Sequence, residues 1–146
     1  MTAAMVAERL GGERVLRRAV ASDLDLAAAV RAGLPAAALE HVLAELARAD
    51  VTQGEVYGVV GNARTLQRRR TARQALSVEE SDRLARLARL LARAEEALGG
   101  RERALRWLTR ANRALGGERP LTLLDSDAGT LAVERVLGRI EHGVAA

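Results

Sequence analysis

The sequence of 146 residues contains no cysteine, no lysine and no phenylalanine, and only two prolines. Without cysteine, the chain can form neither a disulfide nor a thiolate metal site. Its only aromatic residues are Tyr57 and Trp107, so the core has to be built from Leu, Val and Ala. Because Ala and Leu favour helix and β-branched runs are few, the composition predicts an all-α protein.

Long apolar runs and targeting segments are also missing. No stretch approaches the roughly 20 apolar residues that a membrane-spanning helix needs. The N-terminal residues lack the apolar core that follows a basic start in a secretory signal. Hydrophobic residues make up 49% and charged residues 29% of the chain, which is a globular composition. We therefore expect a cytoplasmic protein with no membrane partner.

The groups that catalysis and metal binding require are scarce as well. The sequence has no P-loop, no dinucleotide-binding glycine motif and no nucleophile elbow. The two histidines, His41 and His142, have no second His or Cys at metal-ligand spacing. No serine has a poised base beside it. We therefore predict that the chain is not an enzyme and holds neither a cofactor nor a metal.

The strongest helix signal that is present lies at residues 76–97. Ser77 and Glu80 match the S-x-x-E capping box at its start, and Gly99 and Gly100 stop it. Apolar residues recur there at steps of three and four, which predicts one buried stripe: Leu84, Leu87, Ala88, Leu91, Ala94 and Leu98. We expect this helix to open the second of two domains, residues 1–75 and 76–146.

Cap and stop residues predict further helices on both sides of this one. Those expected before it span residues 5–20 with a break at Gly11-Gly12, 23–31, 35–50, 53–60 and 63–74. After it, helices are expected over 101–112 and from Ser126 or Asp127 to Gly143. Pro120 is expected to prevent a helix, so residues 121–124 are predicted to be extended. The inward face of 101–112 is predicted to hold Ala104, Leu105, Trp107, Leu108 and Ala111.

One short segment concentrates positive charge. Five of the 23 arginines fall within ten residues, with no acidic residue among them: Arg64, Arg68, Arg69, Arg70 and Arg73. They outnumber the whole net charge of +4. They lie on the second of two short predicted helices, 53–60 and 63–74, which are joined by a turn at Gly61-Asn62. Such a pair is typical of a helix-turn-helix.

Two interpretations of this cluster are open. A charge run is commonly a solvated face, although a face built only for solubility would interleave acids. Alternatively, the arginines neutralise DNA phosphates, and nearby polar side chains contact phosphates or base edges. We favour the second interpretation and predict these DNA contacts: Arg64, Thr65, Gln67, Arg68, Arg69 and Arg70.

Several short strings occur in one order along residues 33–144. They are Gly33-Leu34-Pro35; Arg64-Thr65-Leu66 with Arg68-Arg69; Leu76-Ser77; Glu80-Ser81-Asp82-Arg83; Arg86-Leu87-Ala88; Ala104 with Trp107-Leu108; Asn112 with Ala114-Leu115-Gly116-Gly117; Pro120-Leu121 with Leu123-Leu124; Asp127 with Gly129; and Arg139-Ile140-Glu141-His142-Gly143-Val144. In this order they resemble the Xre/MbcA/ParS antitoxins, the partners of RES-domain toxins in bacterial type II toxin–antitoxin pairs.

The resemblance implies an all-helical protein with an N-terminal Xre-like helix-turn-helix region and a C-terminal toxin-binding domain. Antitoxins of this family are not catalytic; they bind a toxin that acts on NAD and keep substrate from its active site. Some also repress their own promoter. The implied partners are a RES-domain toxin and promoter DNA, in a homodimer or a hetero-oligomer with the toxin. A DNA-binding repressor without a toxin partner is the alternative.

The resemblance also implies where the toxin would be contacted. The matching positions lie on the helix predicted over residues 76–97 and at the C-terminal end: Arg83, Arg86, Arg139, Ile140, Glu141, His142, Gly143 and Val144. The last six would form a plug mounted on the final helix. Ile140 and Val144 give this plug an apolar side that a partner could bury, and Arg139, Glu141 and His142 could pair with charged groups of a nucleotide pocket.

Overall fold

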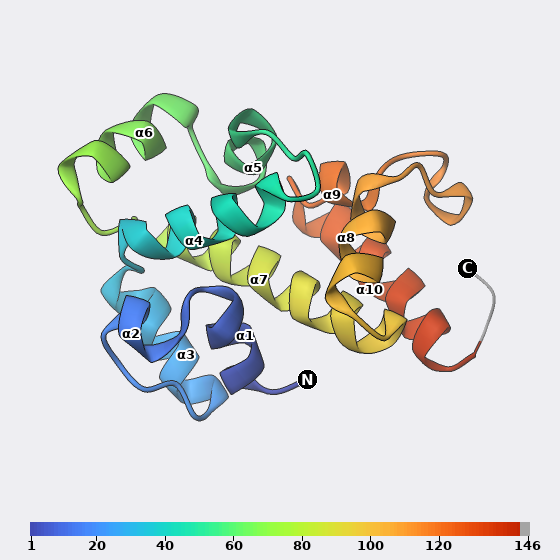
Figure 1. Ribbon diagram of the computed structural model, residues 1–146, viewed down its shortest axis with the longest axis horizontal. Helices are drawn as coiled ribbons and strands as arrows, with labels where there is room; N and C mark the ends of the chain where they lie inside the picture. The colour runs from blue at the N-terminus through green and yellow to red at the C-terminus, as the bar shows by residue number, and fades with distance from the viewer. Residues whose placement is uncertain (144–146) are drawn as a thin grey trace. The chain divides into compact units, whose positions relative to one another are not determined.

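The computed structural model describes residues 1–143, and these residues form helices and loops without a β-strand (Figure 1). The all-α prediction is therefore confirmed. The helices are α1 Ala3–Arg9, α2 Gly12–Leu16, α3 Asp23–Ala32, α4 Ala36–Ala47, α5 Gln53–Val60, α6 Ala63–Ala72, α7 Val78–Leu98, α8 Arg101–Thr109, the 3-10 helix η1 Arg113–Leu115, α9 Pro120–Leu123 and α10 Asp127–Glu141.

The chain divides into two compact units, Met1–Arg89 and Leu90–Ala146, which we call unit 1 and unit 2. The division falls inside α7, because the part of α7 up to Arg89 packs within unit 1. The sequence-based boundary at 75/76 lies before this helix. That boundary was placed at the start of the predicted helix, and it stays a prediction.

In unit 1, α4 is the central helix. It contacts α2, α5 and α6, and in Figure 1 it lies between the α5–α6 pair and the group of α1, α2 and α3. Its apolar residues Leu39, Val42 and Leu46 are fully buried, as the predicted amphipathic face requires. Leucines from the surrounding elements complete this core: Leu10, Leu34, Leu66, Leu84 and Leu87.

Buried hydrogen bonds fasten the loop after α3 to the start of α7. The amide of Leu34 donates to Oγ of the fully buried Ser81, at 2.8 Å, and the amide of Leu76 donates to the Leu34 carbonyl, also at 2.8 Å. Gly33 precedes them with φ +88°, and a Cβ there would lie 2.6 Å from the Leu76 carbonyl oxygen. This contact explains why a glycine starts the Gly33-Leu34-Pro35 string.

Unit 2 combines the last part of α7 with α8, η1, α9 and α10. The short helix α9 contacts both α8 and α10. Leucine, valine and alanine side chains fill the interior: Leu90, Leu91, Ala94, Leu105, Leu108, Leu121, Val133 and Leu137. At Gly129 a Cβ would overlap the carbonyl oxygen of Leu123, so the first turn of α10 approaches the end of α9 backbone to backbone.

Several sequence-based expectations for unit 2 were wrong. Pro120 begins α9 instead of preventing a helix, because proline at the first helical position loses no intrahelical hydrogen bond. Trp107 is half-buried and Ala111 is exposed, since α8 ends at Thr109 and its inward face is narrower than expected. Leu131 lies on α10 and is 46% exposed, although the α10 residues Val133, Val136 and Leu137 are buried.

Within residues 1–143, no single helix combines the length and apolarity needed to cross a membrane. The pair α3 and α4, bent by 111° at the loop between them, meets the criterion by length and composition alone.

Candidate functional site

The helix-turn-helix predicted at residues 53–74 is formed by α5 and α6. Thr52 and Glu55 make a capping box at the start of α5, in which the Thr52 amide donates to Glu55 Oε2 at 2.8 Å. Asn62 caps α6 by accepting a hydrogen bond from the Thr65 amide at 3.1 Å. The helix α6 ends at Ala72, two residues before the predicted end, where Arg73 adopts a left-handed conformation.

Two of the five clustered arginines are bound within unit 1. Arg69 Nε donates to Glu80 Oε1 at 2.7 Å, and the same oxygen accepts the Ser77 amide at 2.8 Å. The α7 capping box is therefore confirmed, and its carboxylate also anchors α6. Arg70 donates to the Tyr57 hydroxyl at 2.6 Å and faces Glu40 at 3.7 Å.

The remaining predicted DNA contacts divide into exposed and half-buried positions. Arg64 and Arg68 are exposed, as is Arg73 at the end of the helix. Gln67 is exposed too, but its Oε1 accepts a hydrogen bond from the Tyr57 hydroxyl at 2.9 Å. Thr65 is half-buried. The free positive charge on α6 thus comes from Arg64, Arg68 and Arg73, and Arg69 and Arg70 hold the helix in place.

The end of α10 holds most of the predicted toxin contacts. Arg139, Glu141 and His142 are exposed, Ile140 is half-buried, and Gly143 follows the helix with φ +75°. Val144 lies outside the described residues.

The structure adds Arg93 of α7, which the sequence did not indicate as part of this site. Its Nε donates to Glu141 Oε1 at 3.0 Å, and its Nη1 lies 3.7 Å from Glu134. No pattern in the sequence links residues 48 positions apart.

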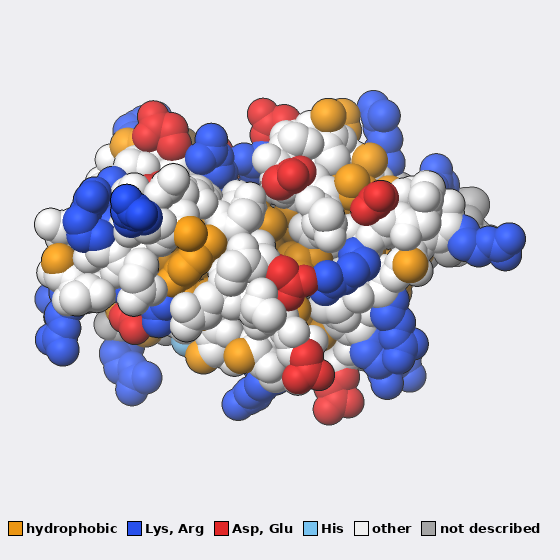
Figure 2. Space-filling view, turned by 90° about the horizontal axis from the view of Figure 1, so that it is seen from above, with side chains coloured by type: hydrophobic (Ala, Val, Ile, Leu, Met, Phe, Trp, Pro, Cys, Tyr) orange, Lys and Arg blue, Asp and Glu red, His pale blue; other side chains and the backbone are white. Residues whose placement is uncertain are grey.

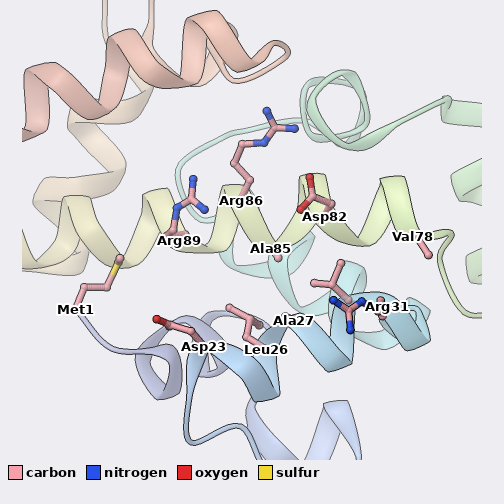
Figure 3. Close-up of a pocket in the computed structure, with 11 residues that line it drawn as sticks. Met1, Asp23, Leu26, Ala27, Arg31, Val78, Asp82, Ala85, Arg86 and Arg89 are labelled. Atoms are coloured by element: carbon pink, nitrogen blue, oxygen red, sulfur yellow. The ribbon is translucent and has the colours of Figure 1, made fainter.

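The other two predicted toxin contacts, Arg83 and Arg86, belong to the part of α7 in unit 1. Arg83 is exposed and Arg86 is half-buried. Arg86 lines a groove of about 630 Å³ between α3 and α7. Figure 3 shows this groove, with apolar side chains from both helices along it and charged groups, among them Arg31, Asp82 and Arg89, around it.

Metal chemistry finds no support in the described residues. Among residues 1–143, no three His, Cys, Asp or Glu side chains come together as a metal would need. The structure offers two charged surfaces: an arginine-bearing helix-turn-helix in unit 1 and a charged helix end in unit 2.

Two family models match the chain, one for each of these surfaces. Residues 25–89 match the antitoxin Xre-like helix-turn-helix domain, and residues 93–143 match the antitoxin Xre/MbcA/ParS C-terminal toxin-binding domain. The chain belongs to the Xre/MbcA/ParS antitoxin family. The family resemblance inferred from the ordered strings is confirmed. Because proteins of this family are not enzymes, the prediction that the chain is not an enzyme agrees with it.

Relatives named Antitoxin Xre support the assignment. The one from Yersinia enterocolitica is 34% identical over 98 residues, which are 66% of this chain and 66% of that protein. The one from Photorhabdus laumondii is 29% identical over 94 residues, 63% of this chain and 64% of that protein. The one from Pseudomonas putida is 39% identical over 80 residues, 55% of this chain and 50% of that protein. The chain thus matches 50–66% of the length of these relatives.

Proposed function

We propose that this protein neutralises a RES-domain toxin by placing the end of α10 and the residues after it in the toxin's active site. The observation that carries the proposal is the match of residues 93–143 to a toxin-binding domain, because α10 ends within that match. Such a protein would act where its toxin acts, so a cytoplasmic location remains our expectation.

The chemistry at the end of α10 supports an occluding role. Arg139 and His142 are exposed and offer donors to the carboxylates or phosphates of a nucleotide pocket. Glu141 is tied to Arg93, so it fixes the direction of the last turn. A helix whose final turn is held by an ion pair presents its exposed donors with little loss of entropy on binding.

Co-expression with a RES-domain toxin tests this proposal. We expect the intact protein to restore growth and cellular NAD, and removal of residues 139–146 to abolish protection. The double substitution Arg139→Ala with His142→Ala should weaken toxin capture at least tenfold. Arg135→Ala is the matched control, because Arg135 is exposed on α10 one turn earlier. Full protection by the truncated chain would show that occlusion by this segment is wrong.

We further propose that α6 contacts the chain's own promoter and represses it. Arg64, Arg68 and Arg73 are exposed on or at the end of the second helix of a helix-turn-helix, the position that enters the major groove in this motif. Replacing them by Gln should weaken binding to the upstream DNA in gel-shift titrations and derepress a reporter. A repressor without a toxin partner is the second candidate; failure to capture any RES-domain toxin, with promoter binding intact, would favour it.

A further inference from the structure

A second arginine-bearing surface lies on α8 in unit 2. Arg103 and Arg106 are three residues apart and lie on one side of α8, and Arg110 follows them as the C-cap residue, where the backbone becomes extended. All three are exposed. The residues on the opposite side, Ala104, Leu105 and Leu108, are buried in unit 2. The three arginines, which we call the α8 stripe, therefore point away from the core.

The α8 stripe lacks internal partners. Within the described residues, none of its arginines makes an ion pair or a side-chain hydrogen bond. Glu102 lies four residues before Arg106, at the spacing that allows a helical ion pair, yet no such pair forms. By contrast, Arg93 in the same unit has two carboxylate partners. The stripe leaves three full positive charges for a partner outside the chain.

The net charge around α8 also distinguishes this surface from an ordinary solvated face. Residues 101–113 contain five arginines and one glutamate, a net charge of +4 (5 − 1). Unit 2 as a whole contains nine arginines and eight acidic residues, a net charge of +1 (9 − 8), so its remainder carries −3 (1 − 4). Over much of the face in Figure 2, red acidic and blue basic side chains are interspersed, as solubility alone would favour.

The kind of partner follows from what accompanies the arginines. Protein–protein interfaces have an apolar centre from which charged residues are depleted. The large hydrophobic side chains exposed in residues 1–143 lie elsewhere: Met1, Met5, Leu24, Val78 and Leu131. Trp107, which flanks the stripe, is half-buried, so the exposed charge of this face is cationic. Such a face suits the DNA backbone, whose contacts are phosphates bound by arginine. From Arg103 to Thr109 the helix rises about 9 Å, and Arg110 follows directly, so the stripe is long enough for about three phosphates of one strand at 3.4 Å each.

We propose that the α8 stripe binds the phosphate backbone of duplex DNA and gives the toxin-binding domain its own sequence-independent affinity for DNA. This site is separate from the helix-turn-helix, and it does not depend on whether α6 reads a promoter. Its contribution is electrostatic. Each of the three contacts is expected to add about 0.9 to the slope of log affinity against log salt concentration.

Fluorescence anisotropy with the full chain tests this proposal on two duplexes of equal length, the upstream region and a random sequence. The triple variant Arg103→Gln, Arg106→Gln, Arg110→Gln should lower the salt slope by about 2.7 on both duplexes. Wild-type affinity should then fall about 40-fold more than that of the variant between 50 and 200 mM salt. The triple Arg→Lys variant should keep most of the slope. A chain lacking the charges of Arg64, Arg68 and Arg73 should retain it as well.

The matched control removes three exposed arginines elsewhere, Arg14, Arg48 and Arg135, and so has the same net charge. Circular dichroism melts confirm that each variant is folded. Equal loss of slope in the control would overturn the proposal, because net charge alone would explain the effect. An unchanged slope in the α8 variant, or absence of DNA binding at 50 mM salt, would also overturn it. Loss of toxin capture with DNA binding intact would identify the stripe as a protein-binding surface instead.

Discussion

The two arginine-bearing helices, α6 in unit 1 and α8 in unit 2, are held in their units in different ways. On α6, Arg69 and Arg70 are bound by groups from α7, α5 and α4, and they fix the helix to unit 1. On α8, apolar side chains hold the helix in place and the arginines of the stripe are left free. Whether an arginine is available to a partner is therefore decided by acids on other helices.

The largest change in stability is expected from a substitution at Gly129. At this residue the backbone of α10 lies against the backbone of α9, the helix that contacts α8. Gly129→Ala would place a Cβ on the Leu123 carbonyl oxygen, and neither group can rotate away. We expect a loss of about 3 kcal/mol in the free energy of unfolding, at the upper end for overpacking. Urea denaturation followed by circular dichroism measures it.

Gly138→Ala is the matched control on the same helix. A Cβ there would lie 3.4 Å from the Arg93 guanidinium, the end of a flexible side chain. Since alanine is the better helix former, this change should raise stability by about 0.5–1 kcal/mol. Equal effects of the two substitutions would show that α9 and α10 do not meet as closely as the structure has them.

The next largest effect is expected at Glu80, which is the acid that removes Arg69 from the surface of α6. Glu80 is buried and accepts hydrogen bonds from both Arg69 and the Ser77 amide. Glu80→Ala should cost about 2–3 kcal/mol, since a cap and a charged hydrogen bond are lost together. Chemical denaturation measures the loss, and Glu79→Ala, at an exposed neighbour, should change stability by less than about 0.5 kcal/mol.

The Glu80→Ala variant also tests whether Glu80 keeps Arg69 from binding DNA. Freed from its carboxylate, Arg69 should become available to phosphate, so the salt slope of DNA binding should rise by up to about 0.9. A slope that does not rise in the folded variant would mean that Glu80 does not keep Arg69 from DNA in the intact protein. In that case the division of α6 into free and fastened arginines would be wrong.

The helices and the family could be predicted from the sequence, because caps, stops and apolar spacing are local signals. Ser22, Thr52, Asn62, Ser77 and Ser126 all cap helices, and each is a residue type that favours this position. Pro120 was misjudged because proline is read as a helix breaker, although the first position of α9 tolerates it. The burial of Trp107 and Ala111 was overestimated because α8 is shorter than its pattern.

The state of each arginine could not be predicted, because the partners are distant in sequence. Arg69 and Glu80 are 11 residues apart on different helices, and Arg93 and Glu141 are 48 residues apart. The α8 stripe could not be predicted from the sequence either, but here the reason is the charge of the residues around it. Its near-neutral surroundings in unit 2 concealed a local excess of positive charge, which only the burial of the opposite face makes visible.

A smaller effect is expected at Arg93, an arginine of unit 2 that is paired with two carboxylates. Its side chain is 29% exposed and that of Glu141 is 34% exposed, so solvent weakens the pair. Arg93→Ala should lower stability by about 0.5–1 kcal/mol, and less in 1 M salt. A double-mutant cycle with Glu141→Ala isolates the interaction. Coupling near zero would remove the support that the pair gives to the last turn of α10.

The smallest effect on stability is expected at Asp25 in unit 1, whose carboxylate accepts a hydrogen bond from a backbone amide and not from an arginine. The Ala21 amide donates to Asp25 Oδ2 at 2.9 Å, and this bond, with help from Ser22, holds the pKa of Asp25 below its ordinary value near 3.8. The folded pKa therefore lies below the unfolded one, so the stabilisation is full above the ordinary value and is lost as pH falls through the folded value. An NMR titration of the Asp25 carboxyl measures the shift. Asp25→Asn should remove this pH dependence of stability, and an Asp25 pKa at or above 3.8 would contradict the contact.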